Sequence, residues 1–146
     1  MAVDDPRPAD AARELTGLER LLDLQFVEVG PDRVELTCTV RPELLQPMGI
    51  LHGGVYCAIV ETAASVGGAL WFAQRGHVVG VANHTNFIRA VRDGLLRATA
   101  TPIQRGRTQQ LWQVEVKDEH DRLLARGEVR LANLSDAGVL GRTPGG

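Results

Sequence analysis

The chain has 146 residues and a mass of 15.8 kDa, which is about the size of one soluble domain. Its composition, 44% hydrophobic and 23% charged, argues against a disordered or fibrous protein. The formal net charge of -2, without blocks of like charge, makes nucleic acid and an anionic membrane surface unexpected partners.

The chain ends and the cysteines predict where the folded part lies and in which compartment it works. Residues 1–8 and 135–146 are rich in Pro, Gly and small polar residues, so we expect flexible ends around a single domain at 9–134. The amino terminus carries an acidic pair and two prolines, unlike a signal peptide. Cys38 and Cys57 are too few for a disulfide framework, which favours a reducing cytoplasm.

The first elements predicted along the chain are a short helix and a pair of strands. Thr16 and Glu19 have capping-box spacing, which predicts an amphipathic helix that Thr16 caps. Residues 24–29 and 33–40 flank a Gly-Pro-Asp turn, and apolar residues alternate with polar ones in the second segment. This period of two predicts two paired strands, one of them with a wet face.

From residue 78 onward the pattern predicts strands alone. The predicted strands cover 78–81, 85–91, 95–102, 109–117 and 122–134. The polar stretch at 118–121 reads as a hairpin loop between the last two strands.

The middle of the chain, residues 55–72, differs because it is apolar on nearly all sides and contains no proline. As a helix it would span ~27 Å, but Glu61 sits mid-segment and no basic anchors flank it, which disfavours a membrane span. Such a helix in a soluble domain must be covered all round. We therefore predict an α+β fold in which a curved antiparallel sheet wraps around a long central helix.

Two glycines, Gly53 and Gly54, stand at the start of this helix. The first amides of a helix lack internal partners and lie at the positive end of its dipole, so they can hold a carbonyl oxygen or an anion. Glycine lets a ligand approach that backbone, although two glycines also suit a tight turn with no further role.

Glu61 is the residue that favours a catalytic function for this segment over a purely structural one. A carboxylate in an apolar helix is costly unless it is paired or hydrogen-bonded, and no Lys or Arg lies within one turn of it. It is either a buried acid paired with a distant arginine, or a nucleophile or general base in a cleft. Ser65, four residues on, shares its helical face and can hydrogen-bond a ligand or water, or simply pack as a small residue.

In four short motifs the chain resembles the hotdog-fold acyl-CoA thioesterases of the phenylacetate-pathway, 1,4-dihydroxy-2-naphthoyl-CoA and 4-hydroxybenzoyl-CoA types. The likeness runs from about Leu15 to Leu134. The motifs are Gln46-Pro-Met-Gly-Ile-Leu-His-Gly-Gly54, Glu61-Thr-Ala-Ala-Ser65, Asn83-His-Thr-Asn-Phe87 and Gly106-Arg-Thr-Gln-Gln-Leu-Trp112. The resemblance implies a hotdog fold and hydrolysis of an acyl-CoA thioester without a bound cofactor.

The resemblance also implies roles for individual residues. The Gly53 amide would hold the thioester oxygen, and Glu61 would attack directly or activate water. Supporting positions that would orient water, substrate or the leaving thiolate are Gln46, His52, Ser65 and His84. A lone histidine is often structural, so His52 and His84 stay open from the residues alone, and no ligand spacing supports a metal site formed with Glu61.

Helix geometry predicts that this site lies between subunits. Eight residues of helix separate the Gly53 and Glu61 backbones by ~12 Å, farther than a glutamate side chain reaches. Two antiparallel helices in a dimer would bring Glu61 of one subunit to the partner's Gly53. The resemblance similarly implies a homodimer or a dimer of dimers, joined edge to edge through the sheets.

The rest of the substrate needs an anion site and an acyl pocket. The guanidinium groups of Arg89, Arg105 and Arg107 match phosphate oxygens and are candidates for the nucleotide end of coenzyme A, though each also reads as an ordinary surface residue. Tyr56, Phe72 and Phe87 are expected near the acyl group, with Gly54 also in contact, or else belong to the core.

Two other functions stay open. A hotdog hydratase or dehydratase would act on a 3-hydroxyacyl thioester, and a non-catalytic protein would only bind acyl-CoA. The position of Glu61 eight residues beyond Gly53 favours the thioesterase. The sequence does not reveal the acyl group.

Overall fold

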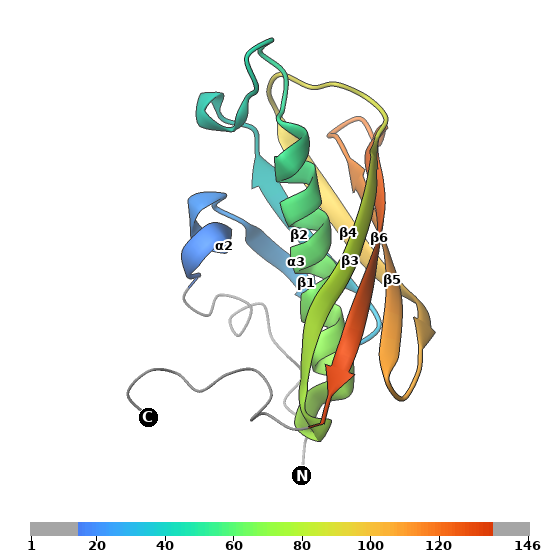
Figure 1. Cartoon of the computed structure of the whole chain (residues 1–146). Helices are drawn as coiled ribbons and strands as arrows, with labels where there is room; N and C mark the ends of the chain where they lie inside the picture. The colour runs from blue at the N-terminus through green and yellow to red at the C-terminus, as the bar shows by residue number, and fades with distance from the viewer. Residues whose placement is uncertain (1–14, 136–146) are drawn as a thin grey trace.

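The computed structural model describes residues 15–135, in which an antiparallel sheet of six strands curls around one long helix (Figure 1). The predicted flexible ends, residues 1–8 and all of 135–146 except Ser135, lie outside the described residues. The elements are α2 (Gly17–Leu21), β1 (Gln25–Val29), β2 (Val34–Thr39), the 3-10 turn η1 (Pro42–Leu44), α3 (Gly53–Phe72), the 3-10 turn η2 (Ala73–Arg75), β3 (His77–Phe87), β4 (Leu95–Arg105), β5 (Gln109–Lys117) and β6 (Leu123–Leu134).

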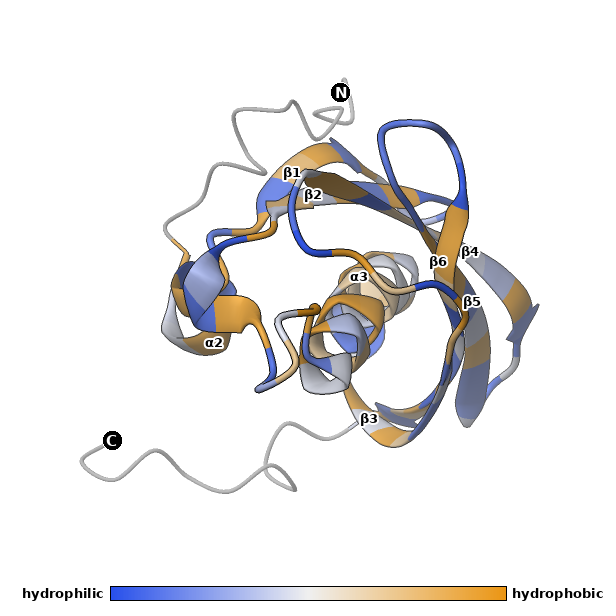
Figure 2. Ribbon diagram, turned by 90° about the horizontal axis from the view of Figure 1, so that it is seen from above, coloured by the Kyte–Doolittle hydropathy of each residue, from blue (hydrophilic) through white to orange (hydrophobic). Residues whose placement is uncertain are grey.

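The strand order is β1-β2-β4-β5-β6-β3, so β1 and β3 are the edges of the sheet. Seen along the helix, these two edge strands lie on opposite sides of α3, which occupies the hollow of the curl (Figure 2). The concave face is apolar because alternate residues point inward, as Trp112, Val114 and Val116 do on β5. The predicted fold is confirmed.

Small residues let the helix approach this face closely. Gly67 lies against the Trp112 ring, and a Cβ added there would be 2.6 Å from the ring. Ala63 and Ala64 are fully buried on the same side of α3. The helix is long and apolar enough to cross a membrane by length and composition, but here its apolar side packs into the sheet.

Three local predictions need correction. Residues 78–81 and 85–91 do not form two strands, because β3 runs unbroken from His77 to Phe87 with an irregularity between Gly80 and Ala82. Thr16 stands at the N-cap of α2 but makes no side-chain capping bond, and Gly17 has a positive φ of 55°. The predicted amphipathic helix needs correction as well, because α2 is only five residues long and buries none of them.

The prediction that α3 is covered on all sides is wrong for the single chain. The sheet does not close between β1 and β3, and one helical face stays exposed at Gly54, Glu61 and Ala69. Ala58 and Ser65, on the same face, are only partly buried. The open face carries small residues around one carboxylate, a surface that another helix can approach closely.

The end of α3 contains a strained residue that yields a test of stability. Ala73 has φ 47° and ψ -119°, a conformation that residues other than glycine rarely adopt. We expect Ala73→Gly to raise the free energy of unfolding by about 1 kcal/mol, because relief of strain exceeds the entropy cost of glycine. Urea denaturation measures this change. Ala69→Gly, in the regular helix, should instead lower stability, and a loss in both variants would contradict the strain.

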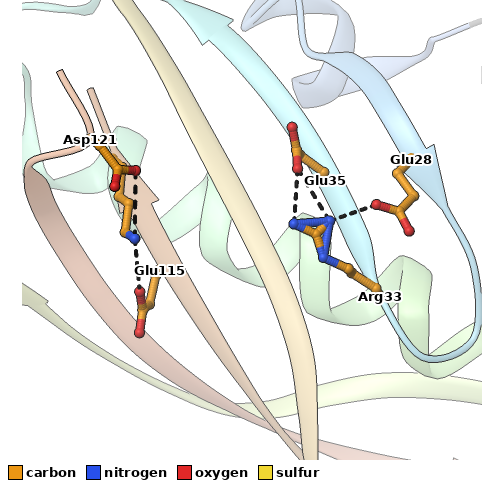
Figure 3. A network of polar contacts seen from close by, with 6 residues as sticks. Glu28, Arg33, Glu35, Glu115 and Asp121 are labelled. Atoms are coloured by element: carbon orange, nitrogen blue, oxygen red, sulfur yellow. Dashed lines mark hydrogen bonds and ion pairs between the residues drawn. The ribbon is translucent and has the colours of Figure 1, made fainter. Parts of the chain in front are cut away.

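The convex face of the sheet is solvated and carries ion pairs (Figure 3). Arg33 lies 2.6 Å from Glu28 and 3.1 Å from Glu35, while Lys117 lies 3.8 Å from Glu115 and 3.6 Å from Asp121. Exposed pairs of this kind contribute roughly 0–1 kcal/mol each. They mark the face that points away from the helix.

Candidate active site

The start of α3 is fixed by the loop before it. The backbone amides of Leu51 and His52 donate to the carbonyls of Val91 and Leu44, at 2.8 and 3.0 Å. His52 is the N-cap, and its Nδ1 accepts a hydrogen bond from the Gly54 amide at 2.8 Å. An accepting Nδ1 leaves the ring proton on Nε2, which an exposed His52 can present to a ligand.

The Gly53 amide is the open donor at this helix start. It makes no hydrogen bond to any residue in 15–135, as expected for the first amide of a helix. The Phe87 ring lies over Gly53, and a Cβ added at this position would be 2.5 Å from the ring. Only glycine therefore leaves both the ring and the amide in place.

Tyr56 packs against the Phe87 ring. The two rings stack with centroids 5.8 Å apart, and the Tyr56 hydroxyl donates to the Arg89 carbonyl at 3.4 Å. Tyr56 is only 2% exposed, so it belongs to the core, whereas Phe87 is 56% exposed and can contact a substrate. Of the three aromatic residues considered for the acyl pocket, Phe87 has the most accessible position.

The environment of Tyr56 predicts a titration anomaly. Burial, and to a lesser extent the Asp118 charge, raises the pKa of Tyr56 to about 12. Because it is the single tyrosine of the chain, absorbance of tyrosinate reports it alone. We expect no tyrosinate in the folded protein at pH 10, and ionisation near pH 10 in urea. Since the folded pKa is raised, stability should fall as the pH rises from 10 towards 12, and ordinary titration in the fold would contradict this burial.

Glu61 is not buried in the single chain, which corrects the sequence prediction. Glu61 is exposed on the uncovered face of α3, and it forms no ion pair with any residue in 15–135. The carboxylate lies against Gly80 of β3, where an added Cβ would collide with its Oε1. Glu61 is therefore held beside the exposed sheet edge and is open to a partner from outside.

The strand β3 runs antiparallel to α3, and we follow their contacts at three positions along the helix. Phe87 lies at Gly53, the Asn83 side chain donates to the Cys57 carbonyl at 3.0 Å, and Gly80 lies at Glu61. Gly53 and Glu61 thus lie two turns apart along the helix, as predicted.

Gln46 and Ser65 are both half-buried, near opposite ends of this face. The Gln46 side-chain oxygen accepts from the Met48 amide, so its amide group is oriented within the turn before the helix. Ser65 lies one turn beyond Glu61 on the same face, as predicted. Within one chain, Gln46 and His52 belong to the helix start, while Ser65 accompanies Glu61.

His84 lies away from the other candidates. Asn83 and Phe87 on β3 face the helix, so the alternation of the strand turns His84 to the convex side, where it pairs in register with Glu128. The structure does not bring His84 to Gly53 or Glu61 of its own chain. Its role at the site stays a prediction.

The three candidate arginines do not form one cluster. Arg89 follows β3 near the start of α3, since its carbonyl accepts from Tyr56. Arg105 and Arg107 lie at the other end of the helix, Arg105 as the last residue of β4 and Arg107 in the connection to β5. Arg105 is already engaged, 2.8 Å from Asp32. One phosphate group cannot contact all three in a single chain.

A groove at the end of α3 joins arginines to an aromatic side chain. Arg75 lies 4.2 Å from the Trp71 ring centroid and Arg105 lies 5.3 Å from it, and Arg107 lines the same groove. Phe72 also lies here, far from Tyr56 and Phe87, so it does not share their pocket. Sequence reasoning missed Arg75, although its spacing of four from Trp71 is a signal for stacking on a helix.

The described part of the chain contains no set of metal ligands. No group of three or more His, Cys, Asp or Glu side chains between residues 15 and 135 is arranged to hold an ion. The arrangement offers instead an open amide, a carboxylate and a polar helix start.

Comparison with known proteins finds relatives among thioesterases and esterases. The model of the thioesterase superfamily matches residues 48–125. A Mycobacterium tuberculosis protein named as an esterase is 46% identical over 134 residues, covering 90% of this chain and 94% of its own. Its solved structure covers 80% of this chain and 94% of its own with a TM-score of 0.78 and 50% identity. The Escherichia coli 1,4-dihydroxy-2-naphthoyl-CoA hydrolase is 35% identical over 113 residues, covering 77% of this chain and 83% of its own.

Two solved structures of a Staphylococcus aureus protein, one of them described as a thioesterase enzyme, match with TM-scores of 0.76 and 0.77. Both are 27% identical and cover 80% of this chain and 97% and 98% of their own. One has a glutamate and the other a glutamine replaced by alanine, at positions 15 residues apart. Gln46 and Glu61 have the same separation in this chain.

Proposed function

The chain belongs to the thioesterase superfamily of hydrolases, and we propose that it hydrolyses an acyl-CoA to a free acid and coenzyme A at a site shared by two subunits. One observation carries the proposal. The Gly53 amide, which has no hydrogen-bond partner among the described residues, and the Glu61 carboxylate lie on one helix, and Glu61 is on its uncovered face.

The chemistry follows from these two groups. The Gly53 amide, at the positive end of the helix, polarises the thioester carbonyl and stabilises the oxyanion that forms on attack. Glu61 either takes a proton from the attacking water or attacks the carbonyl carbon itself, giving an anhydride that water then hydrolyses. In both routes the carbon–sulfur bond breaks and the leaving thiolate of coenzyme A takes up a proton.

A second copy of the chain completes the site. The edge strand β3 is long and exposes apolar side chains such as Val81, which is 57% exposed, so it favours edge-to-edge pairing with another β3. A two-fold axis across that edge lays the open faces of two α3 helices side by side and antiparallel. Glu61 then faces the partner's Gly53, with Gln46 and His52 from the partner's helix start.

The proposed two-fold axis predicts that the Cys57 residues of the two subunits lie close together. If Glu61 faces the partner's Gly53, the axis passes the midpoint between positions 53 and 61, and the two Cys57 residues lie next to each other. Mild oxidation with copper phenanthroline should therefore link two chains through Cys57, as seen on a non-reducing gel. In the reducing cytoplasm where we propose that the protein works, the pair stays reduced.

The second cysteine provides a matched control. Cys38 is 1% exposed, and burial raises the pKa of its thiol, so it should not react. Cys38→Ala should keep the cross-link and Cys57→Ser should lose it. A protein that is monomeric, or that cross-links through Cys38, would contradict the proposed dimer.

The groove at the end of α3 suits the nucleotide end of coenzyme A. Trp71 lies ten residues beyond Glu61 on the same helix, ~15 Å along its axis, a separation comparable with an extended pantetheine arm. The groove combines an aromatic ring with Arg75, Arg105 and Arg107, and phosphate oxygens match guanidinium groups. Arg89, at the opposite end of the helix, lies nearer the acyl end of the site.

A thiol-release assay over aromatic, medium-chain and long-chain acyl-CoAs tests the function and identifies the acyl class. Hydrolysis releases one free thiol for each acid formed. A change in enoyl absorbance without thiol release would instead support a hydratase. Tight binding without turnover of any substrate would support a binding protein.

A further inference from the structure

We propose that Asn83 is a positioning residue, which sets the register of α3 against the β3 edge and so holds Glu61 where the partner's Gly53 can meet it. This inference rests on the proposed intersubunit site. Asn83 lies outside the set of residues assigned a role at that site.

Asn83 provides the directional contact among the three between β3 and α3. The contacts of Phe87 with Gly53 and of Gly80 with Glu61 are van der Waals contacts. The Asn83 side chain instead donates a hydrogen bond to the Cys57 carbonyl at 3.0 Å. In a regular helix that carbonyl also accepts the amide of Glu61. The bond therefore ties the strand to the helical turn that carries the carboxylate.

The Asn83 amide is itself held in one orientation. The Thr85 hydroxyl donates to Asn83 Oδ1 at 2.7 Å. Thr85 fits because Gly127 of β6 lies opposite, and a Cβ added there would be 2.6 Å from the Thr85 hydroxyl oxygen. The three residues form a chain of contacts from β6 through β3 to the helix.

Folding alone does not require polar residues at these positions. Neighbouring strands fill the face toward α3 with apolar side chains such as Val114, Val129 and Ala125. Half-buried Asn83 and Thr85 gain little net stability from their bond, but they are satisfied in one register only. A valine or leucine would pack there in several registers.

Register matters here because β3 is the edge at which the two subunits meet. A slide of α3 along β3 moves Glu61 relative to the partner's Gly53, and a misplacement of about 1 Å can cost on the order of 100-fold in rate. We therefore expect Asn83→Leu to lower kcat for the best acyl-CoA by about tenfold or more. KM should change less than about threefold, since the coenzyme A groove is untouched. Thr85→Val, which only frees the amide, should show a smaller loss of kcat.

Gln110→Leu is the matched control. Gln110, on β5, also donates an amide hydrogen bond to a carbonyl of α3, that of the buried Gly68 at 3.2 Å, about two turns beyond Glu61. This variant should lower the melting temperature with kcat unchanged. Hydrogen exchange of the helical turn from Cys57 to Glu61 should rise in Asn83→Leu and not in Gln110→Leu, whether or not turnover is measured.

The outcomes separate this inference from the proposed function. Absence of thiol release from the parent protein overturns the function, whatever Asn83 does. An active parent whose Asn83→Leu variant is dimeric by light scattering and keeps its kcat overturns the positioning role. If Asn83→Leu does not fold, the same two readings are taken from Thr85→Val.

Discussion

Glu61→Gln is expected to lower kcat by about 1000-fold while acyl-CoA still binds. The substitution keeps the shape of the side chain and removes the negative charge that both routes need, whether Glu61 attacks the carbonyl or takes a proton from water. KM should stay within a few-fold of the parent value, because the Gly53 amide and the groove proposed for coenzyme A are unchanged. Thiol release under single-turnover conditions, with binding of a non-hydrolysable thioether analogue, measures both quantities.

The chain offers a matched control for this loss. Glu128 is an exposed glutamate on β6 that faces the convex side of the sheet, away from α3. Glu128→Gln changes the net charge equally and should leave kcat unchanged. A Glu61→Gln variant with parent-like turnover would show that another group performs the chemistry.

Mixing two inactive variants should restore activity. Gly53→Val places a branched side chain where the Phe87 ring now lies, beside the helix-start amide, so we expect it to lower turnover by at least about 100-fold. A heterodimer of Gly53→Val with Glu61→Gln contains one site with both substitutions and one with neither. Random reassociation of equal amounts should therefore recover about a quarter of the parent activity.

This recovery depends on where the two residues meet. If Glu61 acted with Gly53 of its own chain, every site in the mixture would carry a substitution and no activity would return. Co-refolding from denaturant, with each variant refolded alone as the control, makes the comparison. Light scattering of the mixture checks that the dimers form.

The core elements could be predicted from the sequence because burial leaves a local pattern. Alternating apolar residues in 33–40 and 109–117 gave β2 and β5 nearly to the residue. The apolar run from Val55 gave α3, which begins two residues earlier, since an N-cap histidine and two glycines carry no hydrophobic signal. The break expected within 77–87 was wrong because polar Asn83 and Thr85 face the helix and interrupt the alternation.

The sequence by itself determined the fold, the helix-start glycines and the spacing of Gly53 and Glu61, because these follow from periodicity and helix geometry. Only the tertiary structure decided that Glu61 is exposed, that Arg89 is separated from Arg105 and Arg107, and that His84 faces outward. The reason is physical: which side of a helix the sheet leaves open, and which ends of distant strands meet, depend on strand order and sheet curvature. No local pattern of residues encodes these two properties.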